Sequence, residues 1–398
     1  MSRASEIKPD DPGRGRRVLF VTTVASTLEA FLLPFARALR GRGVRVDALA
    51  ADTLSLPALE GEFDQRFEIG WTRSARCLVR YRRLARELRA LVAREGYDTV
   101  WAHTPIAALV TRAALRRMRQ VRIVYTAHGF HFYQGGRPWF EQRLYRLAER
   151  HAARHWTDVL VVMNDEDEAA AQRWFVQAGG RARGRLVRID GIGIDADAWA
   201  PLALDSAREA ELRRRFQVPM GSFVVALIAE MNANKRPELL IEAVALLRHR
   251  GSLPWMRLLL IGQGPREAEL RALVEARGLT GVVIFAGQLR TPELRELLTL
   301  VNAGMLVSGR EGLPRSLMEL CAAGIPLAGT HTRGVVDEVA DERALAREAS
   351  AEALAELIER LAKDPGLRAD LAQAQFARLQ ERYVLDHILK QYVELLGH

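Results

Sequence analysis

The segment SGREGLPRSLMELCAAGIP, residues 308–326, combines two carboxylates with the start of a short helix. Pro314 suits the first turn of a helix, because that position needs no backbone N–H and its φ matches that of a prolyl ring. The helix is predicted to end at Gly324. Its N-terminus would offer free N–H groups and a positive dipole end to an anion. Because Glu311 and Glu319 flank that end, the segment indicates a ligand that is anionic in one part and hydroxylated in another.

Around this segment, short apolar runs alternate with longer helical patterns. The runs are rich in valine, leucine and isoleucine, which is typical of parallel strands buried on both faces. The predicted strands are 17–24, 44–51, 98–104, 121–129, 157–164 and 185–195 in the first half, and 222–230, 256–264, 282–287 and 305–309 in the second. Two such sets predict two doubly wound α/β domains, with a ligand bound in the crevice between them.

The spacing of Glu311 and Glu319, followed by a short helix and the Gly-x-Pro of residues 324–326, resembles the signature of family 4 of the GT-B glycosyltransferases. In that family the first glutamate lies at the donor sugar and the second holds the ribose hydroxyls of a nucleotide sugar. The matching segments spread over residues 17–390 and are most specific between 228 and 338. The bland alternative is a surface helix that carries two acids by chance.

The resemblance implies the GT-B architecture, in which two Rossmann-like domains face each other across a cleft and a C-terminal helix crosses back to the first domain. We therefore predict an N-terminal acceptor-binding domain and a C-terminal donor-binding domain. The predicted divisions are a disordered tail at 1–15, the first domain at 16–195, a linker at 196–216, the second domain at 217–378 and the crossover helix at 379–398.

Lys235 lies between a predicted strand and a helix, where its charge can neutralise a diphosphate leaving group. A surface lysine at a helix start is the alternative, but the chain has only four lysines. Members of the family usually carry an arginine five residues earlier, whereas this chain has Glu230 there. Either this subgroup stabilises the leaving group with fewer cations, or another arginine replaces the missing one. The candidates to replace it are Arg236, Arg310 and Arg315.

Further donor contacts are expected at glycine turns. The Gly-Gln-Gly of residues 262–264 follows a strand, and glycine lets a backbone approach a ligand closely. The resemblance places this turn and Gly287 beside the nucleobase. The third glycine of a dinucleotide fingerprint is missing, which counts against a dinucleotide cofactor. The predicted donor-binding residues are Glu319, Gly312, Leu313, Arg315, Gly262, Gly264 and Gly287.

His128 stands at the end of the strand predicted at 121–129, where a neutral imidazole could hydrogen-bond the donor sugar or its phosphate. An isolated histidine is more often a satisfied core residue, but the family places a histidine at the corresponding strand end. His131 is the less favoured choice. With His128, the predicted catalytic residues are Glu311 and Lys235. Possible acceptor contacts, at other strand ends facing the crevice, are Thr23, His103 and Asn164.

The net charge of +9 lies almost entirely in the first half, where residues 1–200 hold 33 Lys and Arg against 23 Asp and Glu. The rest of the chain holds 25 against 26. An anionic membrane surface, nucleic acid or an acidic acceptor could explain this excess. Nucleic acid ranks last, because no nucleic-acid-binding module accompanies the arginines. A solvated arginine face without a partner remains the plain alternative. The densest stretches are 73–94 and 112–122.

These patterns and the resemblance together predict a retaining, metal-independent glycosyltransferase. The expected donor is a nucleoside diphosphate sugar whose nucleotide is UDP, and the expected transferred group is a hexose or N-acetylhexosamine. The expected acceptor is a saccharide on polyprenyl diphosphate, in the synthesis of a bacterial surface polysaccharide. No cofactor is predicted. No metal site is predicted either, because the Asp-x-Asp of residues 195–197 falls in the linker. The chain has no run of about 18 uncharged apolar residues and no secretory signal, so a cytoplasmic protein, peripheral at the inner membrane face, is expected.

Two alternatives remain open from the sequence. A non-hydrolysing epimerase of UDP-N-acetylglucosamine would share the nucleotide site, although it needs several further acids that we cannot place. An inactive sugar-nucleotide-binding scaffold is favoured faintly by Glu230 and opposed by the presence of Glu311, Glu319 and Lys235. The two cysteines, Cys77 and Cys321, lie far apart and indicate a reduced protein without structural disulfides.

Overall fold

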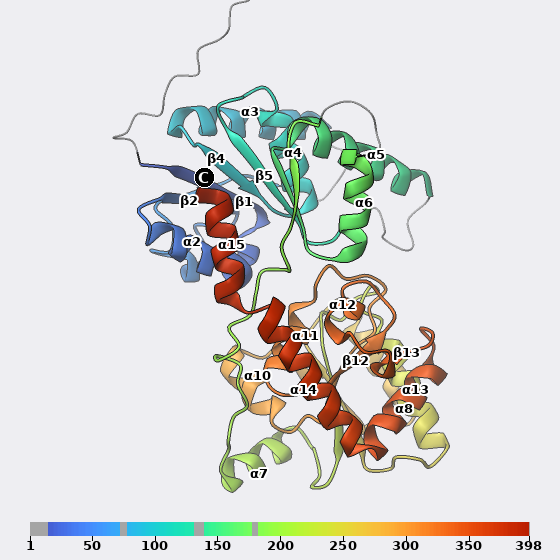
Figure 1. The fold of residues 1–398 in the computed structure, drawn as a ribbon. Helices are drawn as coiled ribbons and strands as arrows, with labels where there is room; N and C mark the ends of the chain where they lie inside the picture. Colours follow the sequence, from blue (N-terminus) through green and yellow to red (C-terminus); the bar gives the residue numbers. More distant parts are fainter. Residues whose placement is uncertain (1–14, 72–77, 131–138, 177–181, 398) are drawn as a thin grey trace, which may run out of the picture.

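The computed structural model describes residues 15–71, 78–130, 139–176 and 182–397. It has two α/β domains stacked end to end, with the C-terminal helix lying on the first domain (Figure 1). The tail predicted at 1–15 lies outside the described residues apart from residue 15, as do His131 and Cys77. The predicted GT-B fold class is confirmed by these two domains of parallel strands.

A seven-stranded parallel sheet forms the centre of the first domain, with the strand order β3-β2-β1-β4-β5-β6-β7. Its strands are β1 (Arg17–Val24), β2 (Arg45–Ala51), β3 (Arg66–Glu68), β4 (Thr99–Ala102), β5 (Arg122–Ala127), β6 (Val159–Val162) and β7 (Arg185–Arg188). The α-helices are α1 (Ala25–Thr27), α2 (Leu33–Arg40), α3 (Leu78–Glu95), α4 (Pro105–Leu115), α5 (Trp139–Trp156) and α6 (Asp165–Val176). Short η1 (Leu28–Leu32, a π-helix) and η2 (Pro57–Leu59, a 3-10 helix) complete the domain.

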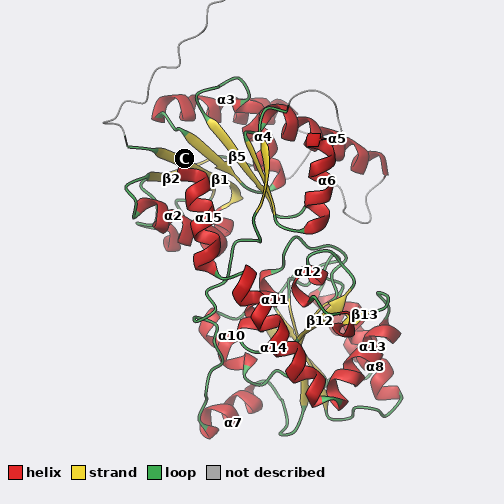
Figure 2. Ribbon diagram, viewed as in Figure 1, coloured by secondary structure: helices red, strands yellow, loops and turns green. Residues whose placement is uncertain are grey.

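Strand β1 shows why these runs form a buried sheet. Val18 and Phe20 pack into the apolar cluster on one face of the sheet, whereas Leu19 and Val21 pack into the cluster on the other face. Successive side chains of a strand point to opposite faces, so a strand that is covered by helices on both sides must be apolar throughout. Helices cover both faces of this sheet (Figure 2).

The second domain has a six-stranded parallel sheet of order β10-β9-β8-β11-β12-β13. Its strands are β8 (Phe223–Ile228), β9 (Met256–Ile261), β10 (Val283–Gly287), β11 (Ala303–Leu306), β12 (Leu327–Thr330) and β13 (Leu345–Ala346). The helices are α7 (Ser206–Arg215), α8 (Pro237–His249), α9 (Glu267–Ala276), α10 (Thr291–Leu298), α11 (Arg315–Ala322), α12 (Val335–Val339), η4 (Glu342–Ala344), α13 (Ala351–Lys363), α14 (Pro365–Arg382) and α15 (Leu385–Gly397).

The segment predicted as a linker, 196–216, is mostly part of the second domain. Helix α7 lies within it, and Leu212 of that helix and Phe216 just after it are buried in the second domain's apolar core. Most residues of α7 are charged, and Leu212 is the buried residue that fixes this helix to the second domain. The chain crosses between the domains earlier, in the residues that follow β7.

The crossover helix predicted at 379–398 is two helices. Helix α14 continues to Arg382, and Leu379 is buried in the core of the second domain. The helix ends there, and α15 packs on the first domain, where Tyr392 lies against Phe35 with ring centroids 5.1 Å apart. The residues between α14 and α15 lie beside the other segment that connects the two domains, because Ile194 N–H donates to Tyr383 O at 2.9 Å. The two interdomain crossings thus form one hinge.

Candidate active site between the two domains

The loop that opens the 308–326 segment is held to the segment between β8 and α8 by two polar side chains. Arg236 donates from Nε to Val307 O at 2.8 Å and from Nη2 to Ser308 O at 2.9 Å. Asn234 donates from Nδ2 to Arg310 O at 3.0 Å. These Arg236 nitrogens are therefore directed to the backbone, so Arg236 acts as a brace of the loop and is a poor replacement for the arginine that Glu230 displaces.

Lys235 and Glu311, which were predicted to act together at the donor, are in contact. Lys235 Nζ lies 2.6 Å from Glu311 Oε1, and the side chains are 20% and 11% exposed. The pair is thus close enough to solvent for a ligand to reach it and sufficiently buried for its charges to interact strongly.

Glu338 lies beside this pair on α12, at the end of the stretch 228–338 in which the sequence match is most specific. It is buried, and neither carboxyl oxygen has a hydrogen-bond partner among the described residues. Burial raises the pKa of Glu338 well above its usual range, and the neighbouring Glu311 raises it further. Burial therefore disfavours the charged form of Glu338, so the Lys235 charge is directed to Glu311 and to a ligand.

Glu319 and Arg315 form an ion pair one turn apart on α11. Arg315 Nε donates to Glu319 Oε1 at 3.1 Å. Burial raises the pKa of Glu319, and Arg315 opposes this rise. Arg315 also donates to Ala30 O in the first domain. Pro34 has no N–H to donate to this carbonyl four residues earlier, so the Ala30 oxygen stays available to Arg315 of α11.

The two domains meet where Gly312 lies against His128 and Gly129. A Cβ on Gly312 would stand 2.1 Å from His128 O, so only glycine allows this approach. Asn164 Nδ2 donates to Gly312 O at 3.0 Å, and Leu313 packs against Gly191 at the hinge. Asn164 is buried and bonded in this way, which gives it a bridging contact; its predicted contact with an acceptor stays a prediction.

A further interdomain contact, which the sequence did not predict, is made by Arg333. Its Nη1 lies 2.5 Å from Asp167 Oδ1, and its Nη2 donates to Phe130 O at 3.0 Å. Asp167 also accepts from Asn164 Nδ2 at 3.0 Å. Arg333 and Asp167 are 166 positions apart in the chain, so no local sequence pattern could have revealed their contact.

His103 and His128 form a pair at the ends of β4 and β5. His103 Nδ1 and His128 Nε2 are 2.9 Å apart, and the His103 ring lies against Trp101 with centroids 4.3 Å apart. Burial lowers the pKa of His103 well below its usual value and that of His128 to about 4. Both rings are therefore neutral at physiological pH.

The surroundings of His103 favour one tautomer of the pair. His103 Nε2 is buried and has no hydrogen-bond partner among the described residues. A buried N–H without an acceptor is rare and costly, so a proton on His103 Nδ1, donated to His128 Nε2, is the better arrangement. His128 then carries its own proton on Nδ1 and offers it as a donor.

The predicted glycine turns have a structural explanation. A Cβ on Gly262 would lie 2.2 Å from Ala229 O, and one on Gly264 would lie 2.5 Å from Met231 O. The chain itself therefore requires these two glycines, and their contact with a nucleobase stays a prediction. Gly287 has a positive φ of 71°, and the nearest atom that a Cβ there would meet is Gln263 Nε2 at 4.0 Å.

Thr23 lies at the end of β1, next to Thr104. The Oγ1 atoms of the two threonines are 2.6 Å apart. Thr104 lies between β4 and α4 with a positive φ of 60°, and its Oγ1 bonds His103 O at 2.6 Å. The first-domain residues Thr23, His103 and His128 thus belong to neighbouring strand ends, as predicted.

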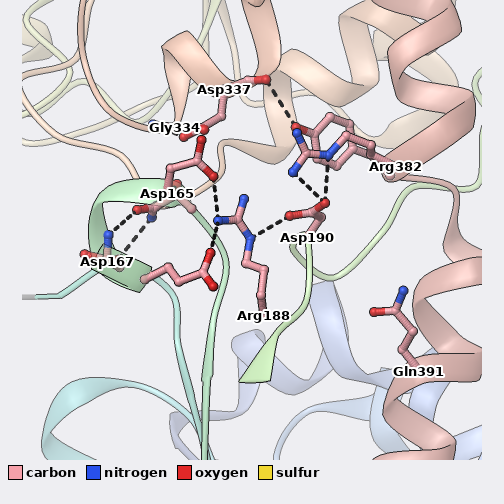
Figure 3. Close-up of polar contacts among 12 residues, drawn as sticks. Asp165, Asp167, Arg188, Asp190, Gly334, Asp337, Arg382 and Gln391 are labelled. Carbon is pink, nitrogen blue, oxygen red and sulfur yellow. Dashed lines mark hydrogen bonds and ion pairs between the residues drawn. The ribbon is translucent and has the colours of Figure 1, made fainter. Parts of the chain in front are cut away.

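An ion-pair network links the first domain to the hinge (Figure 3). Arg188 contacts Asp165 and Asp190, each at 2.7 Å, and Arg382 contacts Asp190 at 2.8 Å. A cavity of about 390 Å³ adjoins the network, lined by Arg188, Asp190, Arg378, Glu381, Arg382, His387 and Gln391. This network fixes the two crossings of the chain to each other.

Comparison with known proteins agrees with this geometry. Residues 28–181 match the family model described as Glycosyltransferase Family 4, and residues 208–378 match that described as Glycosyl transferases group 1. EpsD of Bacillus subtilis (strain 168), which bears the name of a glycosyltransferase, is 31% identical over 367 residues, or 90% of each chain. The lipopolysaccharide core biosynthesis glycosyltransferase LpsE of Rhizobium meliloti (strain 1021) is 29% identical over 216 residues, covering 54% of this chain and 55% of LpsE.

Among solved structures, HepE of Anabaena in complex with UDP and glucose aligns with a TM-score of 0.74. The alignment covers 96% of this chain and 99% of HepE, at 19% identity. The fold and the paired domains define a GT-B glycosyltransferase. On its match to EpsD and the two family models, the chain belongs to glycosyltransferase family 4.

The length and apolar character of the helices decide whether one of them could span a membrane. Within the described ranges, no helix has both the length and the apolar character that a bilayer crossing requires.

Proposed function

We propose that the protein transfers a sugar, with retention of configuration and without a metal ion, from a UDP-sugar to a saccharide carried on polyprenyl diphosphate. The reaction would serve the synthesis of a bacterial surface polysaccharide. The observation that carries the proposal is the contact of Lys235 with Glu311 beside the N-terminus of α11, next to the place where Gly312 approaches the His128 backbone. A cation, free helix N–H groups and carboxylates converge there.

Each side chain has a task in this proposal. Lys235 and the N-terminus of α11 stabilise the negative charge that develops on the leaving diphosphate. Glu319 accepts hydrogen bonds from the ribose hydroxyls, and Glu311 orients the sugar. His128 donates from Nδ1 to the sugar or its phosphate. The leaving phosphate takes the acceptor proton on the same face of the sugar, so no covalent nucleophile is needed.

The interdomain contacts support a reaction that excludes water. Arg333, Asn164 and the Gly312–Gly129 approach hold the domains closed over the Lys235 pair. A donor sugar exposed to water would hydrolyse, so closure protects it until the acceptor is bound. Support for the donor also comes from HepE, whose structure contains UDP and glucose.

Support for the acceptor and its place comes from the surface of the first domain. The exposed arginines of α3 would attract the anionic headgroups of a membrane that holds a lipid-linked saccharide. They are Arg80, Arg82, Arg83, Arg86 and Arg89. The name of LpsE, which refers to lipopolysaccharide core synthesis, supports a role in surface polysaccharides.

A donor panel tests the proposal. The purified protein would be incubated with UDP- and GDP-sugars, with and without a polyprenyl-diphosphate-linked saccharide and with and without EDTA, and free nucleotide measured. Nucleotide release from a UDP-sugar only with acceptor, and unchanged by EDTA, is expected. An epimerised UDP-sugar would instead indicate the epimerase, and tight UDP binding without turnover would indicate the scaffold.

Glu319→Gln is expected to weaken UDP binding about 10–100-fold, which corresponds to the loss of hydrogen bonds to a charged acceptor. Because burial raises the pKa of Glu319, wild-type affinity should fall with decreasing pH, starting above the ordinary glutamate range. The variant should lack this dependence. Titration calorimetry with UDP from pH 4.5 to 8 measures both. Glu267→Gln on α9, which breaks a similar pair with Arg271, is the control and should bind UDP normally.

His103→Leu is expected to lower kcat about tenfold with little change in KM, because His128 loses the donor that sets its tautomer. His103→Asn keeps a nitrogen donor near the Nδ1 position and should restore most of the rate. Nitrogen-15 NMR of the His128 ring reports the tautomer directly and should change only in the leucine variant. Equal rates and equal ring spectra in both variants would contradict this role.

A further inference from the structure

Helix α5 has an unusual outer face. Of the large apolar side chains that stand exposed in the described part of the chain, four lie on this helix. They are Trp139, Phe140, Leu144 and Leu147, with 73%, 57%, 66% and 53% of their surface exposed. Apolar side chains exposed singly are ordinary, whereas several on one helix mark an interaction surface.

The inner face of α5 is committed to the fold. Ala152 and Ala153 are buried, and Glu149 contacts the buried Arg112 of α4 at 2.6 Å. Helix α5 therefore cannot turn its apolar residues inward, and its outer face is fixed in place.

Two parallel stripes run along this outer face. Phe140, Leu144 and Leu147 follow an i, i+4, i+7 spacing, which places them on one line of the helix. Trp139, Arg143, Arg146 and Arg150 follow the same spacing one residue earlier, and the three arginines are exposed. An apolar stripe bordered by arginines and a tryptophan is the pattern of a helix that lies in a membrane interface.

The basic surface extends beyond α5. Helices α3 and α5 both pack against α4, and the three lie along the same side of the first domain in Figure 1. The exposed arginines of α3 thus belong to the same layer as the stripes of α5.

From this arrangement we propose that the outer face of α5 inserts into the headgroup region of an anionic lipid bilayer. The apolar stripe would enter the acyl boundary while the arginines bind lipid phosphates. The charge of this face argues against a second copy of the chain as its partner. Self-association would bring arginines of both copies together on a surface that loses its water. Helix α5 begins eleven residues after His128, so insertion would hold the active site near the bilayer.

The inference rests on the proposed function, since a lipid-linked acceptor gives the surface its purpose. In this arrangement α5 inserts into the bilayer and places the enzyme on it, whereas the arginines of α3 add electrostatic attraction only.

Vesicle co-sedimentation of the full-length protein tests it. Vesicles of phosphatidylcholine with 30% phosphatidylglycerol are compared with phosphatidylcholine alone, a fraction of about one third anionic lipid chosen to match an anionic leaflet. Wild-type protein should bind the anionic vesicles at least tenfold more tightly. Phe140→Ser, Leu144→Ser and Leu147→Ser combined should lower this binding at least tenfold. Serine at three exposed sites elsewhere, Leu54, Met220 and Phe376, is the matched control and should bind like wild type.

Three results would overturn the inference: wild type that binds neither vesicle, wild type that binds both alike, or an α5 variant that binds as tightly as wild type. Light scattering adds a fourth, a wild-type dimer that the α5 substitutions dissociate. UDP binding by the α5 variant separates this inference from the proposed function. A variant that binds UDP but not vesicles supports the inference, whereas a wild type that binds vesicles but no UDP-sugar refutes only the proposed function.

Discussion

Lys235→Ala is expected to lower turnover about 10²–10³-fold, the cost of removing one preorganised group that stabilises charge in a transition state. Lys235 Nζ contacts Glu311 Oε1 at 2.6 Å, beside the N-terminus of α11, where the diphosphate would separate from the sugar. Its charge matters most when the leaving group becomes more negative, so the loss should appear in kcat more than in the donor KM. Lys235→Arg keeps the charge and should retain part of the rate.

Steady-state kinetics with the donor found in the panel measures this loss. Lys363→Ala is the matched control, because Lys363 also contacts a glutamate, Glu359, at 2.5 Å but stands on the exposed surface of α13. Surface pairs of this kind contribute little, so the control should have wild-type rates. A Lys235→Ala enzyme that keeps wild-type turnover and a wild-type melting temperature would remove Lys235 from the mechanism.

The sequence predicts the architecture well because its strongest signal is burial. Strands covered on both faces must be apolar throughout, and runs such as those of β1 and β8 reveal this without any alignment. The strands β3 and β13 at two sheet edges were missed, since they have three and two residues and carry no such run. Strand β12 was missed for its shortness and its glycine.

The site could be predicted only in part. The carboxylates and Lys235 are polar residues at strand and helix ends, where the fold class itself directs attention. A glycine at 262 or 264 would be expected both where the backbone approaches a ligand and where two chain segments pass closely, and the sequence cannot distinguish these two reasons. Arg333 and Asp167 come together only when the two domains meet, a contact that has no local pattern.

Gly312→Ala is expected to lower turnover about 100-fold or more while leaving UDP affinity nearly unchanged. The new Cβ would stand 2.1 Å from His128 O and 2.6 Å from His128 C, both backbone atoms that cannot rotate away. The domains would have to separate by about 1 Å, a displacement of reacting groups that can cost about 100-fold in rate. Glu319, Lys235 and Glu311 all lie in the second domain, so the nucleotide site itself should survive.

The control for this prediction lies three residues earlier in the same loop. A Cβ on Gly309 would meet Arg236 Nε at 3.7 Å and Asn234 O at 3.8 Å, which are ordinary contacts. Gly309→Ala should therefore keep both turnover and UDP binding. If Gly312→Ala turns over normally, the closed approach of Gly312 to His128 is not the reactive arrangement. If it loses UDP binding together with turnover, the substitution has damaged the donor site, and closure is not what the variant measures. Only loss of rate with retained UDP affinity assigns Gly312 to the contact that brings His128 to the donor.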